Sequence, residues 1–148
     1  MKFEIEGMSE LQNKLSRLAG SVTTGNVVTE GLAEGAAKIR DTAKRLAPVD
    51  EGQLRNSIIV QVVDTGVVDV AATAEHAIYN EYGTGKLGDP SVPHTTKDSW
   101  VYKGSDGNFY TTHGMEPRPF MYPALQAHKD DVVRILREHL QKAVDGHG

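Results

Sequence analysis

The most regular hydrophobic pattern in the chain lies between residues 32 and 46. Apolar residues recur there at spacings of four, three, four and three: Leu32, Ala36, Ile39, Ala43 and Leu46. This spacing places a narrow apolar stripe along one side of a helix. Because Pro48 has no amide hydrogen and disfavours helical backbone at the residue before it, we expect the helix to stop at Ala47.

Gly31 and Gly35 lie beside this stripe. Each lowers helix propensity by about 1 kcal/mol relative to alanine. Glycines next to an apolar seam favour the close approach of another backbone. That approach can serve packing within the chain or a contact between subunits, and we favour packing within the chain.

Two more helices are predicted on either side of this one. The first follows Ser9 and Gln12, which have the spacing of a capping box, and carries Leu11, Leu15 and Leu18 on one stripe. We expect the polar, glycine-containing stretch 20–26 to be a connector. The last helix runs from Met121 to Val144, with Pro123 tolerated in its first turn. Its apolar residues near one face are Leu125, Val132, Leu136, Leu140 and Ala143.

Shorter patterns predict strands. Phe3 and Ile5 share one face of a short opening strand. The runs 57–63 and 67–72 are rich in Ile and Val and flank a turn at 64–66, which is typical of an antiparallel hairpin. Residues 77–82 fit either a short helix or an extended segment, and Gly83 ends it.

Residues 83–117 form a long stretch with weak periodicity. Two aromatic runs, 100–102 and 108–110, flank a polar glycine-containing turn and predict a second, exposed hairpin. Four aromatic residues lie on it: Trp100, Tyr102, Phe109 and Tyr110. They either fold back on the core or meet a partner protein, and we favour a partner.

The predicted fold class is therefore α+β, with a small antiparallel sheet packed against two long helices and an extended loop or hairpin protrusion at 83–117. A chain of 148 residues fits one domain, 1–148. No stretch approaches the roughly 20 apolar residues that span a bilayer, so we expect no membrane partner.

The net charge of −4 argues against nucleic acid as a direct ligand. The clearest basic cluster is diluted by acidic neighbours and is interpreted as a solvated helix face; it comprises Lys38, Arg40, Lys44 and Arg45. The chain has no cysteine, which excludes disulfides, thiolate zinc sites and thiol catalysis.

Candidate chemistry is weak throughout. The six histidines lack metal-ligand spacing, and Gly83-Thr84-Gly85-Lys86 lacks the spacing of a phosphate loop. We therefore expect no catalytic, cofactor or metal site, and no enzyme. One alternative stays open: a small ligand-binding or hydrolytic domain that uses the 83–117 loop as a lid over His94 or His113.

Four motifs in order carry a resemblance. They are Phe3-Glu4-Ile5-Glu6-Gly7, residues 47–58 (APVDEGQLRNSI), Tyr79-Asn80-Glu81-Tyr82-Gly83-Thr84, and residues 118–125 (RPFMYPAL). In this order, with long helices around them, the chain resembles the tail-component family of long-tailed bacteriophages called gene-product-ten-like. Relatives of that family act in tail completion or head-to-tail joining.

The resemblance implies a structural virion protein at the head–tail junction or the top of the tail, assembled in the bacterial host cytoplasm. It implies a homo-oligomeric ring, six subunits to match the tail. The ring would contact the tail tube or terminator protein on one side and the head connector on the other. A minor capsid or other prophage virion component is a second alternative.

The motif residues are interpreted mainly as determinants of the fold: Pro48, Asp50, Gly52, Leu54, Ser57, Ile58, Tyr79, Gly83, Thr84, Pro119, Phe120, Pro123 and Ala124. The polar motif residues Glu81 and Arg118 lie near opposite ends of the long loop. We hypothesise that they pair, within one subunit or between neighbours, and fix the base of the loop. Together with the four hairpin aromatics, they are the candidate interface residues.

Overall fold

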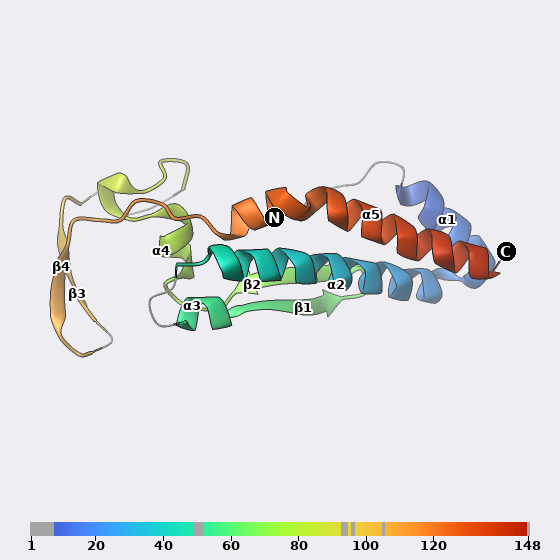
Figure 1. Ribbon diagram of the computed structural model, residues 1–148, viewed down its shortest axis with the longest axis horizontal. Helices are drawn as coiled ribbons and strands as arrows, with labels where there is room; N and C mark the ends of the chain where they lie inside the picture. The colour runs from blue at the N-terminus through green and yellow to red at the C-terminus, as the bar shows by residue number, and fades with distance from the viewer. Residues whose placement is uncertain (1–7, 49–51, 93–94, 96, 105, 148) are drawn as a thin grey trace.

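The computed structural model describes residues 8–48, 52–92, 95, 97–104 and 106–147, and shows an elongated molecule (Figure 1). The helices are α1 (Met8–Ala19), α2 (Ser21–Leu46), α3 (Gln53–Asn56), α4 (Ala77–Tyr82), the 3-10 turn η1 (Gly85–Leu87) and α5 (Met121–His147). The strands are β1 (Ile58–Asp64), β2 (Val67–Ala72), β3 (Trp100–Lys103) and β4 (Phe109–Thr112). The predicted strand at 3–5, the Asp50-Glu51 part of the turn and His94 lie outside the described residues.

The elements stack in layers around α2. Helices α5 and α1 cover one side of α2, and the β1–β2 hairpin covers the opposite side (Figure 1). The second hairpin, β3–β4, stands apart from these layers at one end of the molecule. The predicted fold class is confirmed: α+β, with a two-stranded antiparallel sheet packed against long helices.

Helix α2 ends where Pro48 predicts, because Ala47 already has extended backbone at φ −61° and ψ 135°. Its beginning differs from the prediction. The stretch 21–26 is helical, and Gly20, at φ +91°, is the one interruption between α1 and α2.

Tertiary contacts explain why the polar stretch 21–26 is helical. The Thr24 hydroxyl donates to the Gly20 carbonyl and accepts from the Ser16 hydroxyl of α1, each at 3.0 Å. On the other side, a Cβ at Gly25 would lie 2.6 Å from the methyl group of Thr65, in the β1–β2 turn. Packing on two sides thus outweighs low helix propensity.

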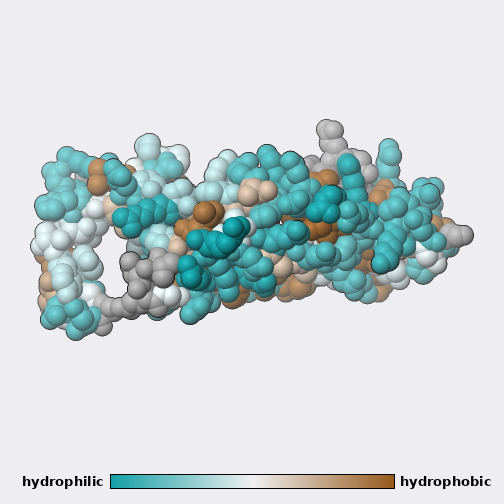
Figure 2. Space-filling model, viewed as in Figure 1, coloured by the Kyte–Doolittle hydropathy of each residue, from teal (hydrophilic) through white to brown (hydrophobic). Residues whose placement is uncertain are grey.

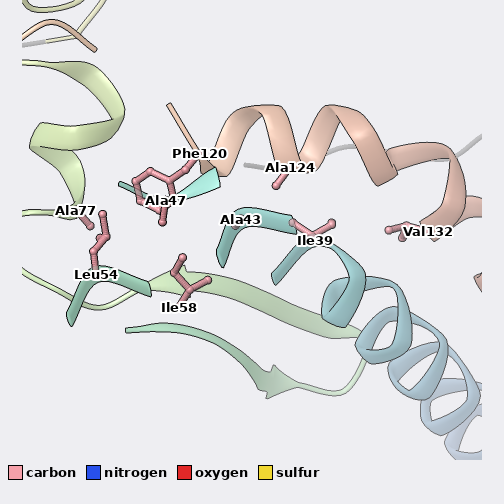
Figure 3. Packing of buried hydrophobic residues seen from close by; sticks show 9 residues of the cluster. All are labelled: Ile39, Ala43, Ala47, Leu54, Ile58, Ala77, Phe120, Ala124 and Val132. Carbon is pink, nitrogen blue, oxygen red and sulfur yellow. The ribbon is translucent and has the colours of Figure 1, made fainter. Parts of the chain in front are cut away.

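Two hydrophobic clusters form the core. The larger one joins α2, α3, β1, α4 and α5 around Phe120, which is fully buried (Figure 3). Its members are Ile39, Ala43, Ala47, Leu54, Ile58, Ala77, Phe120, Ala124 and Val132. The second cluster lies towards the opposite end of the helices and contains Leu15, Leu136, Leu140 and Val144.

The glycines of α2 face α5. A Cβ at Gly31 would lie 3.3 Å from the Cα of Leu136, and a Cβ at Gly35 would lie 3.2 Å from the Cα of Val132. Both distances are shorter than ordinary van der Waals contact, so a side chain at either position would require α2 and α5 to shift apart. The prediction that these glycines serve packing within the chain is confirmed.

The β1–β2 hairpin has one covered and one open face. Its register pairs Ile58 with Ala72 and Val60 with Val70, and these side chains face α2. The alternate positions, Ile59, Gln61 and Asp69, are exposed. No helix among the described residues is long and apolar enough to cross a membrane.

Candidate assembly interface

Glu81 joins the start of the long loop to its end. Its carboxylate accepts three backbone hydrogen bonds: Phe120 N–H at 2.8 Å, Met121 N–H at 3.0 Å and Tyr122 N–H at 2.9 Å. These amides lie at the beginning of α5, where a helix has unsatisfied donors and a partial positive charge. Glu81 is only 9% exposed, so α4 supplies a buried carboxylate cap for α5.

The predicted pair between Glu81 and Arg118 is therefore not formed within the chain. Arg118 is exposed, and its backbone N–H donates to the Asn80 carbonyl at 2.6 Å. The base of the loop is instead held by the Glu81 carboxylate on the amides of α5 and by the Arg118 N–H on the Asn80 carbonyl. The sequence motif identified Glu81 as a charged residue of interest, but it did not reveal that the partners of Glu81 are backbone amides. A pair between neighbouring subunits stays a prediction.

A narrow neck follows this base. Thr84 and Met115 form an antiparallel bridge. The Thr84 nitrogen lies 2.8 Å from the Met115 carbonyl oxygen, and the Met115 nitrogen lies 3.1 Å from the Thr84 carbonyl oxygen. Gly83 has φ +73°, and a Cβ there would lie 2.5 Å from the Met115 carbonyl oxygen. Only glycine satisfies both conditions. We define residues 84–115 as the arm and the other described residues as the body.

The arm ends in the predicted second hairpin. Strand pairing places Val101 opposite Thr111 and Lys103 opposite Phe109, and places Tyr102 opposite Tyr110 on the other face. The Tyr102 and Tyr110 rings contact each other, with centroids 5.9 Å apart. The Tyr110 hydroxyl also donates to Asp106 in the turn, and this bond lowers the pKa of the Asp106 carboxyl.

The four hairpin aromatics differ in their surroundings. Trp100 is half-buried and packs over Gly85, where its ring lies 3.0 Å from the position of a Cβ. Tyr102, Phe109 and Tyr110 are exposed, Phe109 to 72%. Trp100 thus contributes to the arm itself, and the other three present apolar surface to solvent. Their role in binding a partner is untested.

The remaining motif residues occupy structural positions. Gly52, at φ +73°, turns the chain into α3, so that Leu54 and Ile58 enter the core. The Ser57 hydroxyl donates to the Leu54 carbonyl at 2.7 Å. Ala124 is fully buried on α5, whereas Tyr79 and Pro119 are exposed.

Exposed apolar residues also occur where the sequence patterns did not direct attention. Val62, Val63 and Val67 lie near the β1–β2 turn, and Ile78 lies on α4 beside Tyr79 and Tyr82. Figure 2 shows hydrophobic surface along the edge of the body where β1 lies and at the outer end of the arm. The Ile- and Val-rich run at 57–63 predicted a hairpin strand, but gave no sign that the second half of β1 lacks cover.

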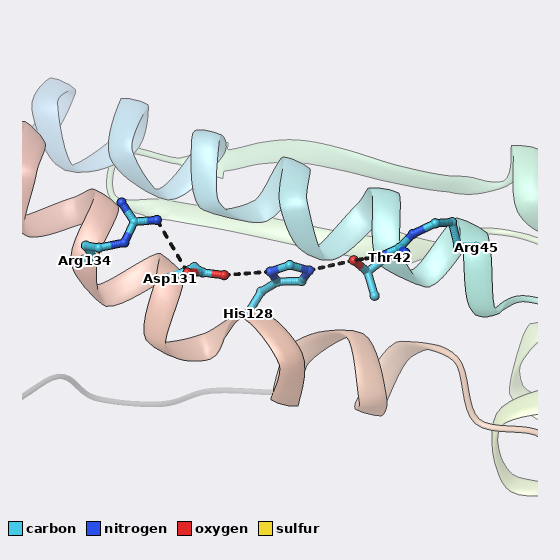
Figure 4. Close-up of polar contacts among 5 residues, drawn as sticks. All are labelled: Thr42, Arg45, His128, Asp131 and Arg134. Atoms are coloured by element: carbon cyan, nitrogen blue, oxygen red, sulfur yellow. Dashed lines mark hydrogen bonds and ion pairs between the residues drawn. The ribbon is translucent and has the colours of Figure 1, made fainter.

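A polar network crosses from α2 to α5 (Figure 4). His128 Nε2 lies 2.6 Å from Thr42 Oγ1, and His128 Nδ1 lies 2.8 Å from Asp131 Oδ2. Arg45 donates to Thr42 Oγ1 at 2.9 Å, and Arg134 pairs with Asp131 at 3.4 Å. Hydroxyl, imidazole and carboxylate thus stand in the order of a hydrolase triad.

The surroundings of Thr42 do not fit a nucleophile. Its side chain is buried between two helices, and its oxygen is occupied by Arg45. Two surface hollows, one between α1 and α5 and one between α2 and α5, are lined by other residues. We interpret the network as a polar clamp between the helices.

The hydrogen bond from His128 lowers the pKa of Asp131, with Arg134 and Lys38 acting in the same direction. A carboxyl whose pKa is lower in the folded state stabilises the fold above its unfolded pKa, about 3.9. That contribution is lost as the pH falls through the folded pKa.

The histidine alternative gains no support from the described residues. They contain no group of three or more His, Asp or Glu side chains that could hold a metal. His113 is exposed on the arm, and neither of the two surface hollows includes it.

The comparison with known protein families gives a match, which covers the first half of the chain. Residues 9–83, about half of the chain, match the family described as "Bacteriophage HK97-gp10, putative tail-component". The chain belongs to this tail-component family. No curated protein or solved structure matches the chain.

The match confirms the resemblance seen in the sequence. It covers α1 to α4 of this tail component, including the motifs at 47–58 and 79–83. The arm, Arg118 and α5 lie beyond it. Members of a phage tail-component family are virion-associated structural proteins, and this protein belongs to that class.

Proposed function

We propose that this tail component acts at the head–tail junction or the top of the phage tail, as one subunit of a ring of identical copies. The observation that carries the proposal is its membership of the tail-component family. The ring, six subunits to match the tail, contacts the tail tube or terminator protein on one side and the head connector on the other. It assembles in the cytoplasm of the bacterial host.

The surfaces of the protein support assembly. A closed ring needs a heterologous interface, in which one patch meets a different patch on the neighbour. The chain offers two separated surfaces of this kind: the arm with Phe109 and the open face of β1–β2 with Ile59. Exposed apolar side chains at both places favour protein partners.

The charge also fits a position on the path of DNA. The chain carries a net charge of −4 and a sequence pI of about 5.8. A wall that repels phosphates lets DNA pass without holding it. A strongly basic lumen in an assembled ring would contradict this part of the proposal.

The decisive experiment is deletion of the gene from the phage or prophage that encodes it. Electron microscopy of the lysate should show DNA-filled heads separate from tails, and expression of the wild-type protein in trans should restore joined particles. Normal infectious particles without the protein would overturn the proposal.

A second experiment measures self-assembly of the purified protein. Native mass spectrometry over a wide concentration range, with negative-stain images, should show a closed ring. If the protein is a monomer in solution, the ring must form on the tail, and the protein should then bind to assembled tail tubes. A protein that neither forms a ring nor binds tail tubes would contradict the proposal.

A further inference from the structure

The open face of the β1–β2 hairpin is apolar and acidic. Ile59, Gln61 and Asp69 are exposed on it, and Ala71 is half-buried. Residues 58–72 include two carboxylates, Asp64 and Asp69, and no lysine, arginine or histidine. This face therefore suits a partner that brings apolar side chains and positive charge.

One face of the arm hairpin has that composition. The register places four exposed residues there: Val101, Lys103, Phe109 and Thr111. Val101 is 63% exposed and Phe109 is 72% exposed, so this face holds the most exposed apolar side chains of the arm. Lys103 is its charged residue, and no carboxylate belongs to it.

The charges on the two faces are available for pairing. Among the described residues, neither Lys103 nor Asp69 has a side-chain partner. Several other charges of the arm are engaged within it, because Lys86 pairs with Asp98 and Asp106 accepts bonds from Tyr110 and Asn108. On the two hairpin faces, the complementary charges are thus Lys103 and Asp69.

The arm does not cover the sheet of its own chain. It stands at the end of the molecule beyond α4, with its strands running across the direction of the long helices (Figure 1). A neighbouring copy lying alongside could present its sheet to this crosswise hairpin. The two faces are different patches of one subunit, as a heterologous ring contact requires.

We infer that the arm of each subunit packs on the open face of the β1–β2 hairpin of the next copy. Phe109 and Val101 lie against Ile59 and Ala71, and Lys103 lies beside Asp69. Face-to-face packing buries apolar side chains that each subunit leaves exposed by itself. This inference rests on the proposed ring and specifies the contact that closes it.

The absence of cysteine allows a direct test in particles. Lys103→Cys and Asp69→Cys proteins are expressed together in the deletion strain, and purified particles are oxidised and run on a denaturing gel. A dimer containing one copy of each variant should appear. Each variant expressed alone should give none.

Lys142→Cys serves as the matched control, because Lys142 is an exposed lysine of α5 outside both faces. It should not cross-link with Lys103→Cys. Cross-linking of Lys103→Cys to a different virion protein, or no Lys103–Asp69 dimer in normal particles, would overturn the inference and leave the ring standing. Joined particles that lack the protein would instead refute the proposed function.

Charge reversal gives an independent readout. Lys103→Glu alone and Asp69→Lys alone should each lower the yield of joined particles by about tenfold or more, since like charges then meet across the contact. The double variant should restore the yield. Because both residues are exposed, unfolding curves should match the wild type, and a failure of the double variant to rescue would overturn the inference.

Discussion

In the body, the side chains of Phe120, Leu15 and Leu140 are completely shielded from water, whereas no described hydrophobic side chain of the arm is fully buried. The body is held by the packing of α2, α5 and β1–β2 around two apolar clusters. The arm is held by backbone hydrogen bonds, glycine turns and the half-buried Trp100. A two-stranded hairpin of this kind is marginally stable by itself.

This difference separates stability from assembly. Changes in the body should alter the free energy of unfolding. Changes to exposed arm residues should alter particle formation and leave the fold intact. The following substitutions test that separation, from the largest expected loss of stability to the smallest.

The same substitution in the two regions gives the sharpest contrast. Phe120→Ala removes a fully buried ring from the main cluster and should lower the free energy of unfolding by about 3–5 kcal/mol. Phe109→Ala, at a 72% exposed position of the arm, should change it by no more than about 0.5 kcal/mol. Urea unfolding followed by circular dichroism measures both. Equal losses would show that the arm is part of the core.

Glu81→Gln tests the joint between arm and body. The amide keeps one acceptor oxygen and no charge, so it cannot satisfy the three amides at the start of α5. We expect a loss of about 1.5–3 kcal/mol in the free energy of unfolding. Glu75→Gln, at an exposed glutamate just before α4, is the matched control and should have almost no effect.

Gly35→Ala tests the close approach of α2 and α5. The new Cβ would lie 2.9 Å from Val132 Cγ2, and the strain should exceed the gain in helix propensity, for a net loss of about 1–2 kcal/mol. Gly146→Ala is the control, because a Cβ there meets nothing within 4 Å. That variant should be as stable as the wild type or slightly more stable.

Excision of the arm should cause no loss of stability. Thr84 and Met115 already form an antiparallel pair, so an Asn-Gly turn can replace residues 85–114. The shorter loop has less closure entropy to lose, which should leave the free energy of unfolding unchanged or raise it by up to about 2 kcal/mol. Joined particles should disappear in a complementation assay. An unfolded body after excision would break the comparison.

Hydrophobic periodicity located most of the elements. The stripe of α2, its end before Pro48, the two hairpins and the C-terminal helix follow from local patterns, because each pattern reflects the spacing of side chains on one face. The prediction failed at residues 21–26, where the polar sequence favours a connector. There the contacts of Thr24 and Gly25 with α1 and the β1–β2 turn hold the backbone in a helix.

The candidate site was predictable only in part. The aromatic residues of the arm were identified from sequence because they form two runs on either side of a polar, glycine-containing turn. The partners of Glu81 could not be predicted from sequence. They are backbone N–H donors, which nearly every residue has and which leave no signature in the sequence. The contact between Thr42 and His128 joins residues 86 positions apart, so no local spacing could reveal it.

The sequence by itself determined the three long helices, the two hairpins, the α+β class and the tail-component family, because periodicity, turn residues and motif order are local properties of the chain. Only the tertiary structure decided which faces are covered. It placed α5 against the glycines of α2, gave Glu81 to the start of α5, and left the arm and one face of β1–β2 open. Burial depends on contacts between residues far apart in the chain, and a local sequence pattern does not specify which of these residues meet.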